Sequence, residues 1–396
     1  MAWSVLASVW EGCKSSARRR THISKAARHS DGWVIPAGLP VSAVLSRNDD
    51  GRRHPDPAVT GRVGIGVVGA GRMGSIHARL IAQRVAEAHL VGIADVNLSV
   101  ARRLAEELGG PPVFGSLDEM LSAPGLSAVL IATSSNRHLD AIRAVAAAGI
   151  DILCEKPIAL TMEDTVAGIA AADAAGVRLQ VGFMRRWDAD YARARARLAS
   201  GALGRPMLFK SLQFDPEPPP PSFANPEVSG GIMVDMGIHE FDLARWLMDD
   251  EVLEVHAFGS SVAHPELATV GDVDSAVVNL HFAGGATGTV ELARNTTYGE
   301  DVRTEVLATA GSVWVGHLPV SHGAWSGGDA AGAVAADGAD PVVPRFEAAY
   351  AAQARGFVRA ILDDRPVDVP GSAGAAALAI ALAAARSMRE GRPVVV

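Results

Sequence analysis

The sequence has few cysteines. Among 396 residues, Cys13 and Cys154 alone carry a thiol, and neither has the Cys-x-x-Cys or Cys/His spacing of a zinc site. Two such cysteines cannot build the disulfide framework of a small secreted protein, and we expect both to stay reduced in a cytoplasm. The composition therefore excludes disulfide-rich scaffolds and offers no cysteine-based metal centre.

The chain also lacks long apolar runs. No run approaches the roughly 18 residues that a membrane-spanning helix needs, so we expect no membrane partner. The hydrophobic share of 48% is nevertheless enough to bury a sizeable core. A soluble globular protein with two domains is the expectation that length and composition favour.

Positive charge is scarce in the main body of the chain. Residues 1–62 hold ten lysines and arginines against five acidic residues, a formal +5, so of the total of −8 the remaining chain carries −13. An acidic body repels phosphate backbones, so we expect no nucleic-acid partner.

Residues 1–62 resemble no folded module. They contain Arg18-Arg19-Arg20 and turn formers such as Asp49-Asp50-Gly51. A secretory signal places its positive charge before its apolar stretch, whereas here the apolar stretch comes first, which disfavours export. We expect a disordered extension or a start site assigned too far upstream, with a transit peptide as the alternative.

From Val63 onward, short apolar runs alternate with amphipathic segments, which is typical of a parallel sheet covered by helices. The pattern predicts strands at Val63–Val68, Leu90–Ala94, Ala128–Ala132, Asp151–Cys154 and Val177–Phe183. It predicts helices at Gly74–Ala86, Leu98–Leu108, His138–Ala148 and Met162–Ala175. We interpret residues 63–182 as a doubly wound, Rossmann-type nucleotide-binding domain.

The second domain, residues 183–396, has a different pattern. After a helix at Asp188–Ser200 and a strand at Pro206–Phe214, we expect a proline-rich extended loop at residues 216–221, followed directly by a helix that carries Asp235 and His239. Strands are predicted at Val252–Val262, Ser275–Phe282, Ala286–Ala293, Thr304–Ala308 and Ser312–Val315. Short connections between them predict an open, largely antiparallel sheet. Residues 316–343 are expected to form a mobile loop before helices at Phe346–Leu362 and Ala373–Arg389.

A glycine-rich turn, Gly69-Ala70-Gly71-Arg72-Met73-Gly74, follows the first predicted strand and opens a helix. This is the context of a dinucleotide-binding fingerprint, in which the first glycine permits the turn and the second admits a pyrophosphate. The second strand ends at Asp95, 21 residues past Gly74. A carboxylate there would bind a ribose 2′-hydroxyl and repel a 2′-phosphate, which favours NAD over NADP. The alternative is an ordinary glycine turn with a solvated aspartate.

The tetrapeptide Cys154-Glu155-Lys156-Pro157 lies at the carboxyl end of a predicted strand, beside the crevice where doubly wound sheets bind ligands. The proline keeps Lys156 out of a helix, so that its ammonium can point outward. A solvated loop lysine is the ordinary interpretation of this position.

Asp235 and His239 are four residues apart on the predicted helix, so both side chains would project from one face. Histidine moves protons near neutral pH, and a neighbouring aspartate can orient its ring. One alternative is a hydrogen bond that merely satisfies a half-buried histidine. A metal site formed by Asp235, His239 and Asp242 is another, which the missing fourth ligand disfavours, so we expect no metal.

With these motifs in order, the chain from Val63 resembles the glucose-fructose oxidoreductase/inositol dehydrogenase/MocA family over some five-sixths of its length. The matching positions are the glycine-rich turn, Glu155-Lys156-Pro157, and Gly231, Asp235, Gly237, His239 and Asp242. Residues 182–188 and 295–299 are most similar to those of inositol 2-dehydrogenases.

The resemblance implies a role for each matching residue. His239 would be the base that removes the hydroxyl proton, Lys156 would stabilise developing alkoxide character, and Asp235 would orient the substrate or tune the pair. The implied NAD-binding residues are Gly69, Gly71, Arg72, Met73, Gly74, Asp95, Thr133, Glu155 and Lys156. The implied substrate-binding residues are Lys156, Arg185, Gln213, Asp215, Asp235, His239 and His138.

One segment departs from the family pattern. Inositol dehydrogenases commonly have His-Arg-Asn-Pro where this chain has Gln213-Phe214-Asp215-Pro216. Gln213 and Asp215 can still bind hydroxyl groups, so a polyol substrate remains compatible. The sequence predicts NAD-dependent oxidation of a ring hydroxyl of myo-inositol or an isomer. An aldose dehydrogenase and a non-catalytic NAD and sugar sensor are the alternatives. A cytoplasmic homo-oligomer, dimer or tetramer, is expected, because the open sheet would otherwise expose an apolar face.

Overall fold

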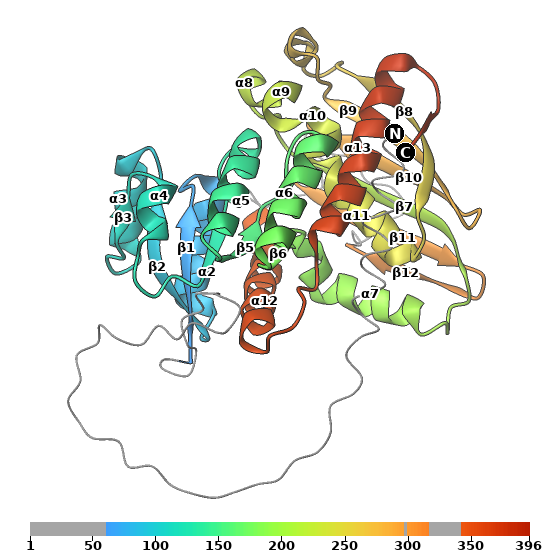
Figure 1. The fold of residues 1–396 in the computed structure, drawn as a ribbon. Helices are drawn as coiled ribbons and strands as arrows, with labels where there is room; N and C mark the ends of the chain where they lie inside the picture. Colours follow the sequence, from blue (N-terminus) through green and yellow to red (C-terminus); the bar gives the residue numbers. More distant parts are fainter. Residues whose placement is uncertain (1–60, 297–298, 317–341) are drawn as a thin grey trace, which may run out of the picture. The chain divides into compact units, whose positions relative to one another are not determined.

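The computed structural model describes residues 61–296, 299–316 and 342–396 (Figure 1). The expected N-terminal extension, except for its last two residues, lies outside this part of the chain. Most of the expected loop at residues 316–343 also lies outside it.

The first sheet has six parallel strands in the order β3-β2-β1-β4-β5-β6. Its strands are β1 (Val63–Val68), β2 (Ala88–Ala94), β3 (Val113–Phe114), β4 (Ala128–Ile131), β5 (Asp151–Cys154) and β6 (Leu179–Val181). The central strands β1, β4 and β5 are buried throughout, as their continuous apolar runs require. This strand order confirms the predicted Rossmann fold, in which ligands bind where the order reverses between β1 and β4.

The helices after these strands cover the first sheet (Figure 1). They are α2 (Arg72–Arg84), α3 (Leu98–Glu107), α4 (Leu117–Leu121), the short 3₁₀ turn η1 (Ser135–Arg137), α5 (His138–Ala147) and α6 (Met162–Ala175). Their starts follow local chemistry: Ser116 accepts a hydrogen bond from Glu119 N, and Thr161 accepts one from Asp164 N. The two-residue strand β3 was not predicted, because it is too short to show a periodic pattern.

One helix of this covering layer comes from the far end of the chain. Helix α12 (Val342–Leu362) packs against α2 and β1, and its Ala354, Phe357 and Val358 share a buried cluster with strands of the first sheet. The order of elements along the sequence does not predict that α12 packs on the first sheet.

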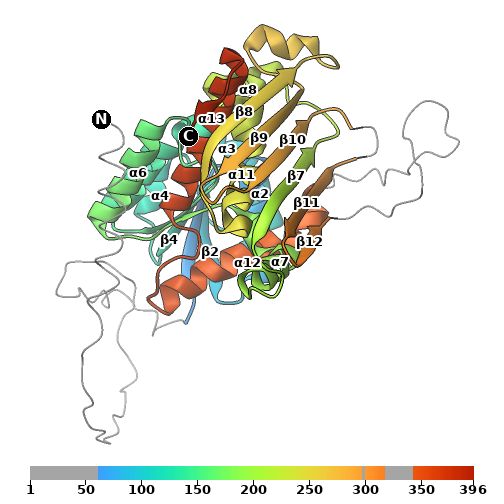
Figure 2. The ribbon, with the colours of Figure 1, turned by 90° about the vertical axis from the view of Figure 1, so that its right-hand side faces the viewer.

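The second sheet has seven strands in the order β12-β11-β7-β10-β9-β8-β13 (Figure 2). These strands are β7 (Pro206–Phe214), β8 (Val252–Ser260), β9 (Ser275–Phe282), β10 (Thr287–Ala293), β11 (Asp301–Ala308), β12 (Gly311–Val315) and β13 (Val394–Val395). All neighbours are antiparallel except β7 and β10, which run parallel. The prediction of an open, largely antiparallel sheet is confirmed.

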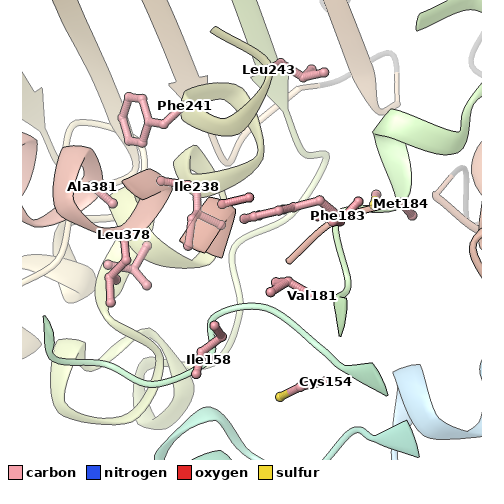
Figure 3. Packing of buried hydrophobic residues seen from close by; sticks show 14 of the residues in the cluster. Cys154, Ile158, Val181, Phe183, Met184, Ile238, Phe241, Leu243, Leu378 and Ala381 are labelled. Atoms are coloured by element: carbon pink, nitrogen blue, oxygen red, sulfur yellow. The ribbon is translucent and has the colours of Figure 1, made fainter. Parts of the chain in front are cut away.

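Helices cover one face of the second sheet and join it to the first. They include η2 (Met184–Trp187), α7 (Ala189–Ala199), α10 (Gly231–Asp235), α11 (Gly237–Met248) and α13 (Gly371–Glu390). Figure 3 shows Cys154 and Val181 of the first sheet, Ile238 and Phe241 of α11, and Leu378 of α13 in one buried cluster. Each large apolar side chain buried there contributes roughly 1.5–3 kcal/mol, so this shared core fixes the loop after β5 against α10 and α11.

Residues 216–220 form neither helix nor strand, as predicted, but the helix that carries Asp235 does not follow them directly. The proline run leads into two short helices, α8 (Pro221–Ala224) and α9 (Pro226–Ser229), because proline is tolerated in the first turn of a helix. Asp235 and His239 also do not share one helix. Helix α10 ends at Asp235 and α11 begins at Gly237, with Met236 between them.

Helix α13 is long and apolar enough to cross a membrane by length and composition, which the sequence analysis did not anticipate. Most of its apolar window is buried inside the protein, against α11, α6 and β8. A buried core helix passes the same test of length and hydropathy, and the packing of α13 is that of a core helix.

Candidate active site

The glycine-rich turn has the geometry that a pyrophosphate site needs. Gly69 has φ +93°, and a Cβ there would lie 2.4 Å from Ala132 O. A Cβ on Gly74 would lie 1.7 Å from Gly69 O, so this position lets α2 approach the turn. A Cβ on Gly71 would meet nothing within 4 Å. The turn therefore leaves open space at the amino end of α2, where backbone N–H groups favour an anion.

Asp95 is fixed against this turn. One of its carboxylate oxygens accepts a hydrogen bond from Ala70 N at 2.6 Å, and the other accepts one from Asn97 N at 2.7 Å. A cavity of about 300 Å³ adjoins the turn between α2 and α3, and Gly71 and Arg72 help to line it. The predicted combination of glycine turn and strand-end acid is present, and its open, N–H-lined side fits a dinucleotide.

Glu155 follows β5 and is buried beside His77, a residue of α2 that the sequence analysis did not single out. The His77 Nε2 and Glu155 Oε1 atoms are 2.6 Å apart. Burial raises the pKa of the Glu155 carboxyl, but the hydrogen bond and charge of His77, together with Lys156, outweigh burial, and the pKa lies below its ordinary value. The only sequence signal for His77 is its place three residues after Gly74.

Lys156 extends from the first sheet to α10. Its Nζ donates a hydrogen bond to Asp235 O at 2.7 Å and lies 3.7 Å from Asp235 Oδ1. Both side chains are partly buried. The ammonium is therefore held by a specific partner from the second domain, and the interpretation of Lys156 as a freely solvated loop lysine is wrong.

The Asp235 carboxylate is shared between two cations. Besides Lys156, Arg294 at the end of β10 places its Nη2 3.3 Å from Asp235 Oδ2 and its Nη1 2.5 Å from Asp272 Oδ2. Arg294 is 1% exposed, and Asp272 also accepts a hydrogen bond from Ile232 N at the start of α10. Sequence reasoning missed both residues, although Arg294 directly precedes the noted stretch at residues 295–299.

His239 is buried in α11, with its ring 6.1 Å from that of Phe183 in an edge-on arrangement. Burial, followed by the positive charges of Lys156 and Arg185, lowers the pKa of His239 well below its ordinary value. Within the described part of the chain its ring makes no hydrogen bond, and Nδ1 is buried without a partner. Asp235 therefore does not orient this ring, because Lys156 and Arg294 hold its carboxylate and the chain kinks at Met236.

Asp242 is paired with Arg186 of η2. Its two carboxylate oxygens accept hydrogen bonds from Arg186 at 2.8 and 2.6 Å. A metal site of Asp235, His239 and Asp242 is therefore wrong. In residues 61–296, 299–316 and 342–396, no three histidine, cysteine or acidic side chains gather in a way that could hold a metal ion.

Arg185 is buried and engaged by protein groups. It forms an ion pair with Glu240, and its Nη2 donates a hydrogen bond to Gln213 Oε1 at 2.8 Å. Gln213 Nε2 in turn donates to Asp215 Oδ1 at 3.3 Å. The structure thus brings Arg185, Gln213 and Asp215 together as one polar chain that ends at Asp215.

His138 is also buried, and its ring connects two predicted site segments. Nδ1 lies 2.7 Å from Pro157 O, and Nε2 lies 3.1 Å from Thr133 O. Burial lowers the pKa of His138 despite these two carbonyl contacts, so the neutral ring donates to only one of them. His138 therefore braces the loops that carry Thr133 and Lys156.

Comparisons with known proteins agree with this geometry. A model described as "Oxidoreductase family, NAD-binding Rossmann fold" matches residues 63–183, and the "GFO/IDH/MocA C-terminal domain" matches residues 191–314. Myo-inositol 2-dehydrogenase of Thermotoga maritima is 34% identical over 83% of this chain and 97% of its own length. The scyllo-inositol 2-dehydrogenase (NAD(+)) of Bacillus subtilis is 34% identical over 83% and 94%.

Solved structures of inositol dehydrogenases are also similar to this chain. The structure of scyllo-inositol dehydrogenase from Lactobacillus casei, with bound NAD(H) and scyllo-inositol, matches with a TM-score of 0.76 and 29% identity, over 84% of this chain and 99% of that one. The chain therefore belongs to the Gfo/Idh/MocA family and is an NAD-dependent oxidoreductase whose relatives include inositol dehydrogenases.

Proposed function

We propose that this protein oxidises a secondary ring hydroxyl of a cyclic polyol, myo-inositol or an isomer, to the ketone. The observation that carries the proposal is the hydrogen bond by which Lys156 reaches the end of α10, directly before the helix that carries His239. The Lys156 ammonium, from the first domain, is bound to Asp235 of α10, and its charge acts on the buried imidazole of α11. A cation that stabilises a developing alkoxide and a base that accepts the hydroxyl proton, both beside the nucleotide-binding crevice, are what alcohol oxidation requires.

His239 acts as the proton acceptor. Because burial and two nearby cations keep its imidazole neutral, a ring nitrogen is free to take the hydroxyl proton at neutral pH. Bound NAD supplies the acceptor for the hydride that leaves the same carbon.

Lys156 stabilises the alkoxide character that develops on the reacting oxygen. Its hydrogen bond to Asp235 O and its proximity to Asp235 Oδ1 hold the ammonium in place before the substrate arrives. A preorganised donor of this kind lowers the barrier because it does not have to reorient during the reaction. Asp235 positions the ammonium, and Arg294 holds Asp235 from the other side.

The cofactor site would use the glycine-rich turn and the end of the second strand. Gly69, Gly71 and Gly74 leave room for a pyrophosphate, with Arg72 and Met73 at the start of α2. Asp95, held beside the turn, retains lone pairs for a ribose hydroxyl. Thr133 and Glu155 follow the adjacent strands β4 and β5, near Lys156.

The relatives support the choice of a cyclitol. The Thermotoga maritima and Bacillus subtilis proteins bear the names of inositol dehydrogenases, and the Lactobacillus casei structure holds scyllo-inositol. An aldose or pyranose is the second candidate, because Gln213 and Asp215 replace residues that inositol dehydrogenases commonly have.

The test is an assay of purified protein with NAD and a panel of inositols and pyranoses, followed by the absorbance of reduced cofactor. Reduction with an inositol isomer is the expected result, and preferential reduction with a pyranose would shift the proposal to the aldose. Binding of NAD and ligand without turnover across the whole panel would contradict catalysis and favour a sensor.

The same proposal includes a cytoplasmic homo-oligomer, dimer or tetramer, formed through the outer face of the second sheet. Leu253, Phe258 and Val277 on β8 and β9 are exposed there, and Phe258 lies directly opposite Val277 in the strand register. Adjacent exposed apolar side chains on a sheet favour burial against another surface. Sedimentation of F258D against the unmodified protein tests this, and an unchanged mass would contradict it.

A further inference from the structure

Asp215 lies at the edge of the proposed substrate site. It follows β7, and its N donates a hydrogen bond to Ala293 O at 2.8 Å, so it lies beside the end of β10. The next residue, Arg294, directly follows β10 and binds Asp235. The carboxylate is close enough to Asp235, Arg185 and Arg294 for all three charges to affect its pKa. Asp215 therefore lies near Asp235 and Arg294, which belong to the same group of charged residues as Lys156.

The cations of this group already have partners. Arg185 pairs with Glu240, Arg294 pairs with Asp272 and Asp235, and Lys156 also contacts Asp235. These three cations face four carboxylates, counting Asp215. Among the described residues, no lysine, arginine or histidine nitrogen lies within 4 Å of the Asp215 carboxylate, although every other acid in this group has such a partner.

The nearest donor to Asp215 is neutral, and its orientation is fixed. Because Arg185 donates to Gln213 Oε1, the amide nitrogen of Gln213 is turned toward Asp215 Oδ1. The remaining oxygen, Oδ2, accepts no hydrogen bond from the described residues. The buried chain from Glu240 through Arg185 and Gln213 thus holds Asp215 in place without neutralising it.

A carboxylate in this position is unfavourable in the free protein. Burial, as the main cause, raises the pKa of Asp215, and the nearby charge of Asp235 raises it further. A ligand that brings a positive charge would remove this cost, because an ion pair offsets part of the loss of hydration. A hydroxyl group offers Asp215 a hydrogen bond but no charge.

We propose that the substrate of this protein is an amino-substituted cyclic polyol or sugar, whose ammonium group pairs with Asp215 while a ring hydroxyl lies at Lys156 and His239. This inference rests on the proposed function and narrows its substrate class. The hydroxyl is still the group oxidised, and the amine serves recognition alone.

The test compares matched substrates in the NAD-loaded protein: myo-inositol against an amino-deoxy-inositol, D-glucose against D-glucosamine, and each amine against its N-acetyl derivative. We expect the amine to have the higher kcat/KM by about tenfold or more, which corresponds to a charge-assisted hydrogen bond. Acetylation removes the charge and should abolish this advantage. Equal kcat/KM values for amine and parent compound would overturn the inference.

The D215N variant tests whether Asp215 causes the preference for the amine. D215N should remove the preference for the amine over the parent compound, while D363N, which neutralises an exposed carboxylate on the turn after α12, should keep it. If the preference persists in D215N, another group binds the amine and the inference is wrong. The acetylation series in the unmodified protein decides the question even if D215N fails to fold.

The failure of this inference differs from the failure of the proposed function. Efficient oxidation of inositol without preference for an amine would support the proposed polyol dehydrogenase function. It would contradict only the proposal that Asp215 pairs with an ammonium group of the substrate. Without turnover on any compound, calorimetry of amine and parent binding in the presence of NAD still measures the pairing, and equal affinities would overturn it.

Discussion

The Lys156 ammonium, from the loop after β5, lies 2.7 Å from the main-chain oxygen of Asp235 at the end of α10. This contact joins the nucleotide-binding domain to the helix pair that carries His239. Because it uses a main-chain oxygen, this hydrogen bond adds to the attraction between the ammonium and the Asp235 carboxylate.

Replacing Lys156 by methionine or His239 by asparagine should lower kcat by on the order of 10²–10⁴, the usual contribution of a general acid or base. Neither side chain lies at the glycine-rich turn proposed for the pyrophosphate, so kcat should fall far more than the affinity for NAD. Steady-state kinetics on the preferred polyol and calorimetric titration with NAD measure the two effects. A parallel loss of NAD affinity would contradict these roles.

Alanine at Gly74 should lower stability, whereas alanine at Gly71 should weaken NAD binding. A Cβ at Gly74 would lie 1.7 Å from Gly69 O, so G74A should destabilise the protein, whereas a Cβ at Gly71 meets nothing within 4 Å. G71A should therefore keep the melting temperature but weaken NAD binding, because the methyl group occupies the space proposed for the pyrophosphate. Unchanged NAD affinity in a folded G71A protein would place the cofactor elsewhere.

Removing the Arg294 guanidinium should lower the free energy of unfolding. R294M leaves Asp272 buried without its cation, and breaking such a pair typically costs about 3–5 kcal/mol of unfolding free energy. The double variant R294M/D272N should recover part of this loss, because it removes the uncompensated charge. Urea unfolding of both variants tests this. Equal destabilisation of the two would show that Arg294 acts through packing instead of charge.

The lowered pKa of His239 predicts how stability depends on pH. The unfolded chain binds a proton to this histidine near its ordinary pKa, while the folded protein resists protonation until a much lower pH. The contribution to stability is therefore complete above the ordinary histidine pKa and falls as the pH drops below it. His138 shifts in the same direction.

The test measures unfolding free energy between pH 8 and pH 5 for the unmodified protein and for H239N, which does not titrate. The unmodified protein should lose more stability than H239N over this range. If the two curves run parallel, the imidazole is not held neutral by the fold.

Much of the fold was predictable because its signals are local. Gly69, Gly71 and Gly74 mark a turn whose geometry needs glycine, and Thr161 starts α6 by accepting a hydrogen bond from Asp164 N. The alternating pattern of β9, with Ala276, Val278, Leu280 and Phe282 buried, likewise identifies a sheet with one covered face. Such features depend on residues a few positions apart.

The rest of the site depends on contacts between distant positions. Arg294 reaches Asp235 across 59 residues, and His77 reaches Glu155 across 78. A basic residue at the end of a strand gives no sign of which acid it will meet. The kink at Met236 is equally hidden, because it lies where Gly237 packs against the distant Leu292 of β10, whose Cδ1 would be 3.0 Å from a Cβ at 237. The sequence suggests candidate residues for the reaction, but not the partners that hold them.

The packing of α12 on the first sheet has a consequence for how the protein is made. Phe357 and Val358 complete a cluster whose other members include Val63, Ile65 and Val67, almost three hundred positions earlier. During synthesis the nucleotide-binding half must therefore keep part of its apolar surface uncovered until nearly the whole polypeptide has left the ribosome. Splitting the gene between the two sheets would yield a first fragment that lacks its own closing helix.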